Sequence, residues 1–92
     1  MTHAEEIMRA VAKLVQQGGS PIFTRDEIRR CIGVSRDRWL SGYTAVFQGM
    51  RSDHPGGAPP VGIKFQGVFR RVEHGKHTLT EYGWQLLQEF QS

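Results

Sequence analysis

Residues 35–51 read SRDRWLSGYTAVFQGMR. Wound as an α-helix, at about 100° per residue, this stretch gathers its apolar side chains within an arc of roughly 120°. Those side chains are Trp39, Leu40, Tyr43, Val46, Phe47 and Met50. The opposite face carries Asp37, Arg38, Ser41, Thr44, Ala45 and Gln48. One face is expected to pack in a core, and the other offers group types that meet base edges in a DNA major groove. Amphipathic surface helices often carry the same groups without binding DNA, so the flanking sequence must decide.

Two interpretations of this stretch stay open at Ser41–Gly42. These residues cost a helix about 1 kcal/mol relative to alanines, and Thr44 can cap a new helix. The segment is therefore either one helix or two short helices bent near Gly42, and in the second case the face assignment holds for only one of them.

Two further helices are predicted before it. Residues 2–5 and 24–27 both have the spacing of a capping box. The first box opens a helix that ends at Gly18 and Gly19. The apolar side chains of this helix form a stripe broad enough to pack against two neighbouring elements. That stripe consists of Ala4, Ile7, Met8, Val11, Ala12, Leu14 and Val15. A short extended segment at Ile22 and Phe23 follows.

The second capping box opens a helix over 25–32, which Gly33 ends. Ser35 then stands where an N-cap for the 35–51 helix is needed. Two capped helices joined by a turn of about three residues have the spacing of a helix-turn-helix.

The pattern changes after residue 51. Residues 52–60, SDHPGGAPP, predict a loop, and Val61, Ile63 and Phe65 alternate as in a strand. Residues 68–72 and 77–79 then predict a β-hairpin around the turn 74–76. Its basic side chains are Arg70, Arg71, His74, Lys76 and His77. They suit a DNA backbone or minor groove, although a solvated basic turn has the same composition.

The last helix is expected to begin after Thr80, its N-cap. Tyr82, Leu86, Leu87 and Phe90 share one face of it. Trp84 lies roughly 60° beyond Leu87. It is either a contact in a homodimer or a side chain that folds over the edge of the domain.

A length of 92 residues predicts one domain, 1–92. The formal charge is +3, and the stretch 24–51 carries that whole excess, with six arginines, no lysine and three acidic residues. Arginine suits forked contacts to phosphate or guanine. A lone Cys31 permits no internal disulfide and is expected to be buried. No apolar run approaches ~18 residues and no leader is evident, so a cytoplasmic location without membrane contact is expected.

Catalysis is not expected. The sequence offers no nucleophile–base pair and no phosphate loop. Asp53 with His54, and His74 with His77, supply too few ligands for a metal site, and both histidines of the second pair are expected to be exposed. We therefore expect no enzyme, no metal and no cofactor.

The order of predicted elements resembles the winged helix-turn-helix superfamily. Residues 75–83, followed by Leu86 and Leu87, resemble the Leu-Thr-x-x-Gly-x-x-Leu-Leu junction of MarR- and PadR-like regulators. The blocks 47–51 and 55–59 are similar to a small uncharacterised bacterial winged-helix family.

This resemblance implies an α+β winged helix-turn-helix with three N-terminal helices, a β-hairpin wing and a C-terminal helix. It also implies a bacterial protein that binds double-stranded DNA, such as a transcriptional regulator, with the third helix in the major groove and the wing on the backbone. We expect base contacts from Arg38, Ser41, Thr44 and Gln48. Phosphate contacts are expected from Arg25, Arg29, Arg36, Arg51, Arg70, Arg71 and Lys76. The alternative is a protein–protein adaptor on the same fold, working through the 52–60 loop and Trp84.

Overall fold

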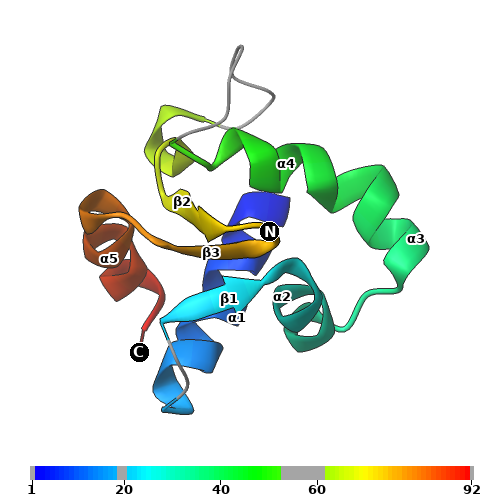
Figure 1. The fold of residues 1–92 in the computed structure, drawn as a ribbon, viewed down its shortest axis with the longest axis horizontal. Coiled ribbons are helices and arrows are strands. Elements are labelled where there is room, and N and C mark those ends of the chain that lie inside the picture. Colours follow the sequence, from blue (N-terminus) through cyan, green and yellow to red (C-terminus); the bar gives the residue numbers. More distant parts are fainter. Residues whose placement is uncertain (1, 19–20, 53–61, 92) are drawn as a thin grey trace.

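The computed structural model describes residues 2–18, 21–52 and 62–91. Figure 1 shows its ribbon. The elements are α1 (His3–Gln16), β1 (Ile22–Thr24), α2 (Arg25–Ile32), α3 (Arg36–Arg38), a π-helical turn (Trp39–Tyr43), α4 (Thr44–Gly49), a 3-10 turn (Ile63–Phe65), β2 (Phe69–Glu73), β3 (Lys76–Leu79), α5 (Glu81–Leu87) and a last 3-10 turn (Gln88–Phe90). The fold is α+β, as the sequence predicts.

Helix α1 is the centre of the packing. Its capping box is complete, because the Thr2 hydroxyl accepts from the Glu5 N–H at 3.2 Å and the Thr2 N–H donates to the Glu5 carboxylate at 2.9 Å. The helix lies behind the sheet in Figure 1 and contacts α2, α4 and α5. Its buried residues are Ala4, Ile7, Met8, Ala10, Val11 and Ala12. The broad stripe is thus confirmed, although Leu14 and Val15 are only half-buried.

Within the described residues, the sheet has three antiparallel strands in the order β1-β3-β2. The predicted hairpin is confirmed, with Gly75 at φ 78° in its turn. The extended segment at Ile22 and Phe23 is also confirmed, and it pairs with β3. This pairing places Thr24 opposite Lys76, so α2 begins beside the hairpin.

The strand predicted from Val61, Ile63 and Phe65 is wrong for the residues that the structure describes. Ile63 to Phe65 form a 3-10 turn in which Ile63 is 87% exposed. The start of the β2 edge is covered by the residues that follow α4 (Thr44–Gly49), since the Met50 carbonyl accepts from the Val68 N–H at 2.7 Å and the Ser52 N–H donates to the Phe69 carbonyl at 2.7 Å. A segment with alternating apolar residues therefore finds no partner there. Val61 and most of the predicted loop, residues 53–60, lie outside the described residues.

Helix α5 begins as predicted, because the Thr80 hydroxyl accepts from the Gly83 N–H at 3.0 Å. Leu86 and Leu87 are buried. The expectation for Tyr82 is wrong: it is 41% exposed, and its hydroxyl donates to the Lys64 carbonyl instead of entering the core. Across residues 2–18, 21–52 and 62–91, no helix has the length and apolar character needed to span a bilayer.

Candidate nucleic-acid interface

The stretch predicted as the DNA-reading helix is one helical run that contains a π-helical turn. The Thr44 N–H donates to the Trp39 carbonyl five residues earlier, so Ser41 and Gly42 lie in a widened turn, and neither a straight helix nor a break at Gly42 describes them. This turn aligns side chains four residues apart, and the rings of Trp39 and Tyr43 stack at 5.6 Å with planes 3° apart.

The widened turn explains one error in the face assignment. Trp39, Tyr43, Phe47 and Met50 are buried as predicted. Leu40, however, is 64% exposed, and Val46 is only half-buried. Because the extra residue in the turn rotates Leu40 away from the core, its placement from a regular α-helical wheel is wrong.

Helix α1 holds the π-helical turn in place. The His3 Nδ1 donates to the Gly42 carbonyl at 2.9 Å, and the His3 ring stacks on Tyr43 at 4.1 Å. A Cβ on Gly42 would lie 3.1 Å from the His3 ring, so glycine permits this approach. The Tyr43 hydroxyl donates to the Glu6 carboxylate at 2.7 Å. Burial and the bond to Glu6 raise the pKa of Tyr43.

We expect Tyr43→Phe to lower the free energy of unfolding by about 1–2 kcal/mol at pH 7, because the hydrogen bond to Glu6 is lost. The raised pKa of Tyr43 gives the wild type a stabilisation that is complete below about pH 10 and disappears as the pH rises through the folded-state pKa. Urea denaturation between neutral pH and pH 11 should therefore show a steeper alkaline loss in the wild type than in Tyr43→Phe. Parallel curves would contradict this assignment.

The four predicted base-contacting residues differ in how they are presented. Arg38 is exposed. The Ser41 hydroxyl is exposed but donates to the Arg38 carbonyl at 3.3 Å. Thr44 is half-buried and donates to the Trp39 carbonyl at 3.1 Å, and Gln48 is half-buried. Both hydroxyls keep lone pairs that can accept, and Arg38 is the one charged donor of the four.

The predicted phosphate contacts also divide by exposure. Arg36, Arg70, Arg71 and Lys76 are exposed, whereas Arg25, Arg29 and Arg51 are half-buried. Arg29 is engaged in the turn after α2, because its Nη1 donates to the Val34 carbonyl at 3.1 Å and its Nε lies 3.5 Å from Asp26. Lys76 pairs with Glu73 at 2.9 Å, which raises the pKa of Lys76 and lowers that of Glu73.

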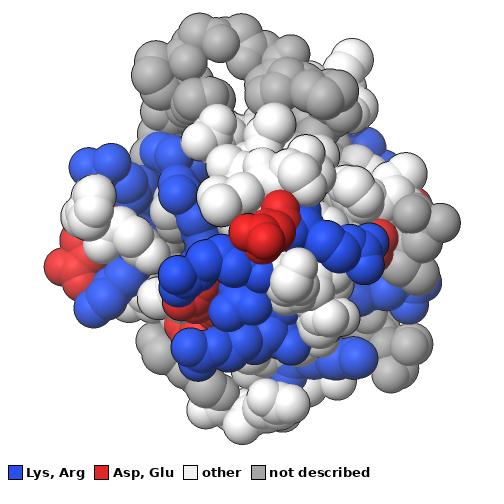
Figure 2. Space-filling model, turned by 90° about the vertical axis from the view of Figure 1, so that its right-hand side faces the viewer, with Lys and Arg blue, Asp and Glu red and all other residues white. Residues whose placement is uncertain are grey.

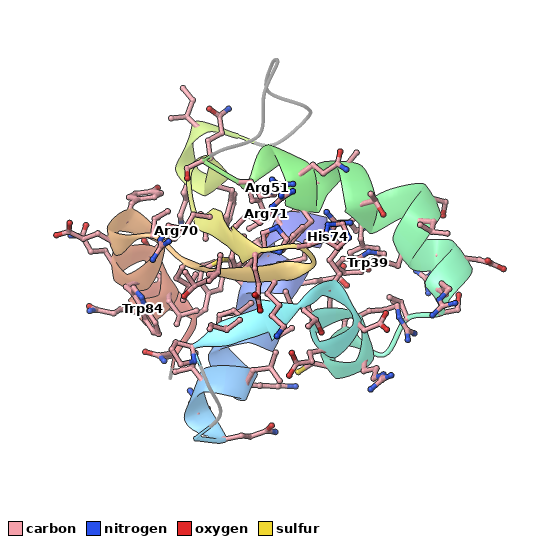
Figure 3. All side chains as sticks on the ribbon, in the orientation of Figure 1. Trp39, Arg51, Arg70, Arg71, His74 and Trp84 are labelled. Atoms are coloured by element: carbon pink, nitrogen blue, oxygen red, sulfur yellow. The ribbon has the colours of Figure 1, made fainter. Side chains whose placement is uncertain are left out.

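Lysine and arginine side chains gather on the side of the molecule where α3 lies. Figure 2 shows this face, with lysine and arginine side chains in a broad band and acidic side chains at a few places within it. Arg70 does not belong to this face, because it lies near α5, on the opposite side from α3 (Figure 3). The hairpin and the helices share the face because Thr24, beside Arg25, pairs with Lys76, and Arg51 forms a bridge with Phe69. The arrangement can neutralise an extended polyanion laid across it.

The expectation for His77 is wrong. It is 1% exposed and meets the Phe47 ring edge-on at 5.0 Å. The reason is register: His77 lies opposite Phe23 in the sheet, so it points to the core side, as alternation along a strand requires. His74 is exposed as expected. Among the described residues, no three His, Cys, Asp or Glu side chains lie close enough together to hold a metal ion. Asp53 and His54 lie outside the described residues.

Cys31 lies on α2 and Trp84 on α5. Cys31 is half-buried instead of fully buried, and its thiol donates to the Ala10 carbonyl at 3.5 Å. Trp84 is 38% exposed on α5. Figure 3 shows it on the opposite side of the molecule from Trp39 and the α3–α4 run, so a contact at Trp84 leaves that helical run free.

Comparison with known proteins adds no relative: no protein-family model, no curated protein and no solved structure matches this chain.

Proposed function

We propose that this protein is a winged helix-turn-helix domain that binds double-stranded DNA, as a transcriptional regulator would. The helical run from α3 to α4 enters the major groove, and the β2–β3 hairpin lies along the backbone. The observation that carries the proposal is the basic face on the side of the molecule where α3 presents the exposed Arg36 and Arg38 (Figure 2).

The order of elements supports this proposal. Two capped helices are joined by a short turn at Gly33, which has φ 90°, and a β-hairpin follows them. The second helical segment presents Arg36 and Arg38 to solvent from its first turn. A helix-turn-helix reads bases with residues near the start of its second helix. Arg38 is accordingly the residue to which we assign a base contact first, with Ser41 and Gln48 behind it.

The test is a fluorescence-anisotropy titration of the protein against a random-sequence duplex. We expect micromolar or tighter binding at low salt, and log K should fall linearly with log salt by about 0.9 for each phosphate contacted. The double variant Arg36→Gln/Arg38→Gln should bind about tenfold or more weakly at the same low salt, because it removes two positive charges from the surface that faces the duplex.

The matched control is Arg9→Gln/Lys13→Gln, which removes the same charge from exposed positions of α1. It should bind nearly as well as the wild type, since neither residue belongs to the proposed interface. An equal loss in both double variants would mean that net charge alone attracts DNA. An absence of binding at micromolar protein and low salt would reject the proposal.

A second candidate function, as a protein–protein adaptor or through a homodimer, is favoured by exposed apolar side chains. Ile63 is 87% exposed and Trp84 is 38% exposed, and Trp84 lies on the opposite side of the molecule from the α3–α4 run (Figure 3). A mass measurement by light scattering, run beside the DNA titration, separates the candidates. A dimer that ignores DNA favours the adaptor function, and a dimer that binds DNA makes Trp84 a contact between two DNA-binding copies.

A further inference from the structure

Leu40 is a large apolar side chain that the π-helical turn (Trp39–Tyr43) presents to solvent. It is 64% exposed, whereas Trp39 and Tyr43 of the same turn are buried. A regular α-helix over this stretch would place Leu40 with the core residues. A leucine left in water forgoes the stabilisation that its burial would supply, and π-helical turns are frequent at functional sites. The exposed leucine is therefore a candidate contact for a partner outside the chain.

Helix α1 fixes the backbone beneath Leu40. The His3 Nδ1 donates to the Gly42 carbonyl at 2.9 Å, and the Tyr43 hydroxyl donates to the Glu6 carboxylate at 2.7 Å. Both hydrogen bonds hold the turn from its inner side, and neither involves Leu40. A side chain on a backbone that is fixed in advance loses less conformational freedom when a partner covers it. Leu40 is therefore preorganised for an external contact.

The residues that border Leu40 along the helical run are charged or polar. Arg36 precedes Leu40 by four residues and Thr44 follows it by four, and side chains four residues apart lie on the same side of a helix. Arg36, Asp37 and Arg38 are exposed, and Thr44 is half-buried. Figure 2 shows that lysine and arginine side chains gather on the side of the molecule where α3 lies. Leu40 is thus an apolar contact bordered by arginines.

This combination matches the major groove of DNA better than it matches the surface of another protein. Phosphates line the edges of the groove and attract arginine. On the floor of the groove, thymine alone among the four bases carries a methyl group, at C5. A leucine bordered by arginines can therefore meet one small apolar group while its neighbours meet anions. A protein interface, by contrast, usually has a central cluster of buried apolar and aromatic side chains.

We propose that Leu40 contacts the C5-methyl group of a thymine in the major groove and so favours a T·A pair at one position of the bound site. The inference rests on the proposed function, and it adds an apolar contact to the polar base contacts of Arg38, Ser41 and Gln48. Leu40 contributes to specificity more than to affinity, because phosphate contacts form with every sequence and the methyl contact only with thymine.

The first experiment removes the methyl group from the DNA. A library of random-sequence duplexes is enriched with the wild-type protein at low salt, and each thymine of the enriched duplex is then replaced singly by deoxyuridine. Uracil keeps the base pair and the O4 acceptor and lacks only the C5-methyl group. At one position we expect binding about fourfold weaker by fluorescence anisotropy, the loss that corresponds to one buried methyl group.

The second experiment removes the leucine. Leu40→Ala should bind the thymine and uracil duplexes alike, with the affinity that the wild type has for the uracil duplex. The matched control is Ile63→Ala, which truncates an exposed apolar side chain in the 3-10 turn across the molecule from α3 (Figure 1). It should keep the fourfold preference for thymine. Circular dichroism checks that both variants are folded. If Leu40→Ala kept the preference, another residue would make the contact and the assignment would be wrong.

The outcomes separate this contact from the proposed function. No binding to any duplex rejects both. Duplex binding without an enriched sequence, or an enriched sequence in which no thymine is sensitive to uracil, rejects the methyl contact and leaves the proposed function. Light scattering on the wild type and on Leu40→Ala tests a second copy of this chain as the occupant. A dimer that becomes a monomer in Leu40→Ala assigns Leu40 to that interface and overturns the methyl contact.

Discussion

Replacing Gly83 with alanine should lower the free energy of unfolding by about 2–3 kcal/mol. A Cβ at this position would lie 2.2 Å from the Val68 carbonyl oxygen and 3.0 Å from the Leu79 side chain. The carbonyl cannot retreat freely, because it also accepts from the Thr80 N–H at 2.9 Å. The gain in helix propensity from alanine, about 1 kcal/mol, offsets part of the collision. Urea denaturation followed by circular dichroism measures the difference.

Gly62→Ala is the matched control for this substitution. Gly62 has φ −65° and ψ 162°, and nothing lies within 4 Å of its would-be Cβ. Alanine accepts these dihedrals, so the variant should be neutral or more stable by about 0.4–1 kcal/mol. If both variants were equally stable, the close approach of α5 to residue 68 would be wrong.

Gly83 belongs to the stretch, residues 75–83, that resembles the wing-to-helix junction of MarR- and PadR-like regulators. Leu79, Leu86 and Leu87 are buried, Thr80 caps α5, and Gly83 permits close contact. Each member of the motif thus has a packing role. The motif is evidence about how the hairpin meets α5, and the question of DNA binding depends on other residues.

Features set by neighbours in the chain could be predicted from the sequence. Both capping boxes form as their spacing requires, and Gly33 ends α2 in the left-handed conformation. The hairpin also follows from a local signal, since strand, turn and strand are consecutive. In each case the partner groups lie within a few residues of each other.

Features set by distant residues could not be predicted. The π-helical turn is held by His3 and Glu6, which lie 39 and 37 residues away from their partners Gly42 and Tyr43. Without that turn, Leu40 would belong to the core. The burial of His77 likewise depends on its pairing with Phe23.

The candidate site also combines a feature that the sequence predicts with features that depend on distant residues. The excess of arginine over 24–51 predicted a basic surface, and in that stretch Arg30, Arg36 and Arg38 are exposed, whereas Arg25, Arg29 and Arg51 are half-buried. Composition could not reveal that the Arg29 guanidinium donates to the Val34 carbonyl, nor that the Arg25 guanidinium lies 5.8 Å from the centre of the Phe47 ring. Both facts depend on how α2, α4 and the sheet meet.

Phe47→Ala is expected to lower the free energy of unfolding by about 3–5 kcal/mol. Phe47 is 1% exposed and contacts the rings of Trp39, Phe69 and His77, so its removal leaves a cavity where α4 meets the sheet. The Arg25 guanidinium also loses the ring beneath it. A domain of this size has roughly 5–15 kcal/mol of stability in total, so a large unfolded fraction should appear at low urea.

Leu40→Ala is the control that tests whether the loss of stability is specific to Phe47 or follows the removal of any large apolar side chain from the α3–α4 run. Both residues are large and apolar, and both belong to the stretch 35–51. Leu40 is 64% exposed, so its loss should change stability by no more than about 0.5 kcal/mol. A regular α-helix over this stretch would instead bury Leu40 and make the two substitutions costly alike. The difference between the two urea midpoints therefore tests the π-helical turn, and with it the direction in which Arg38 and Ser41 face.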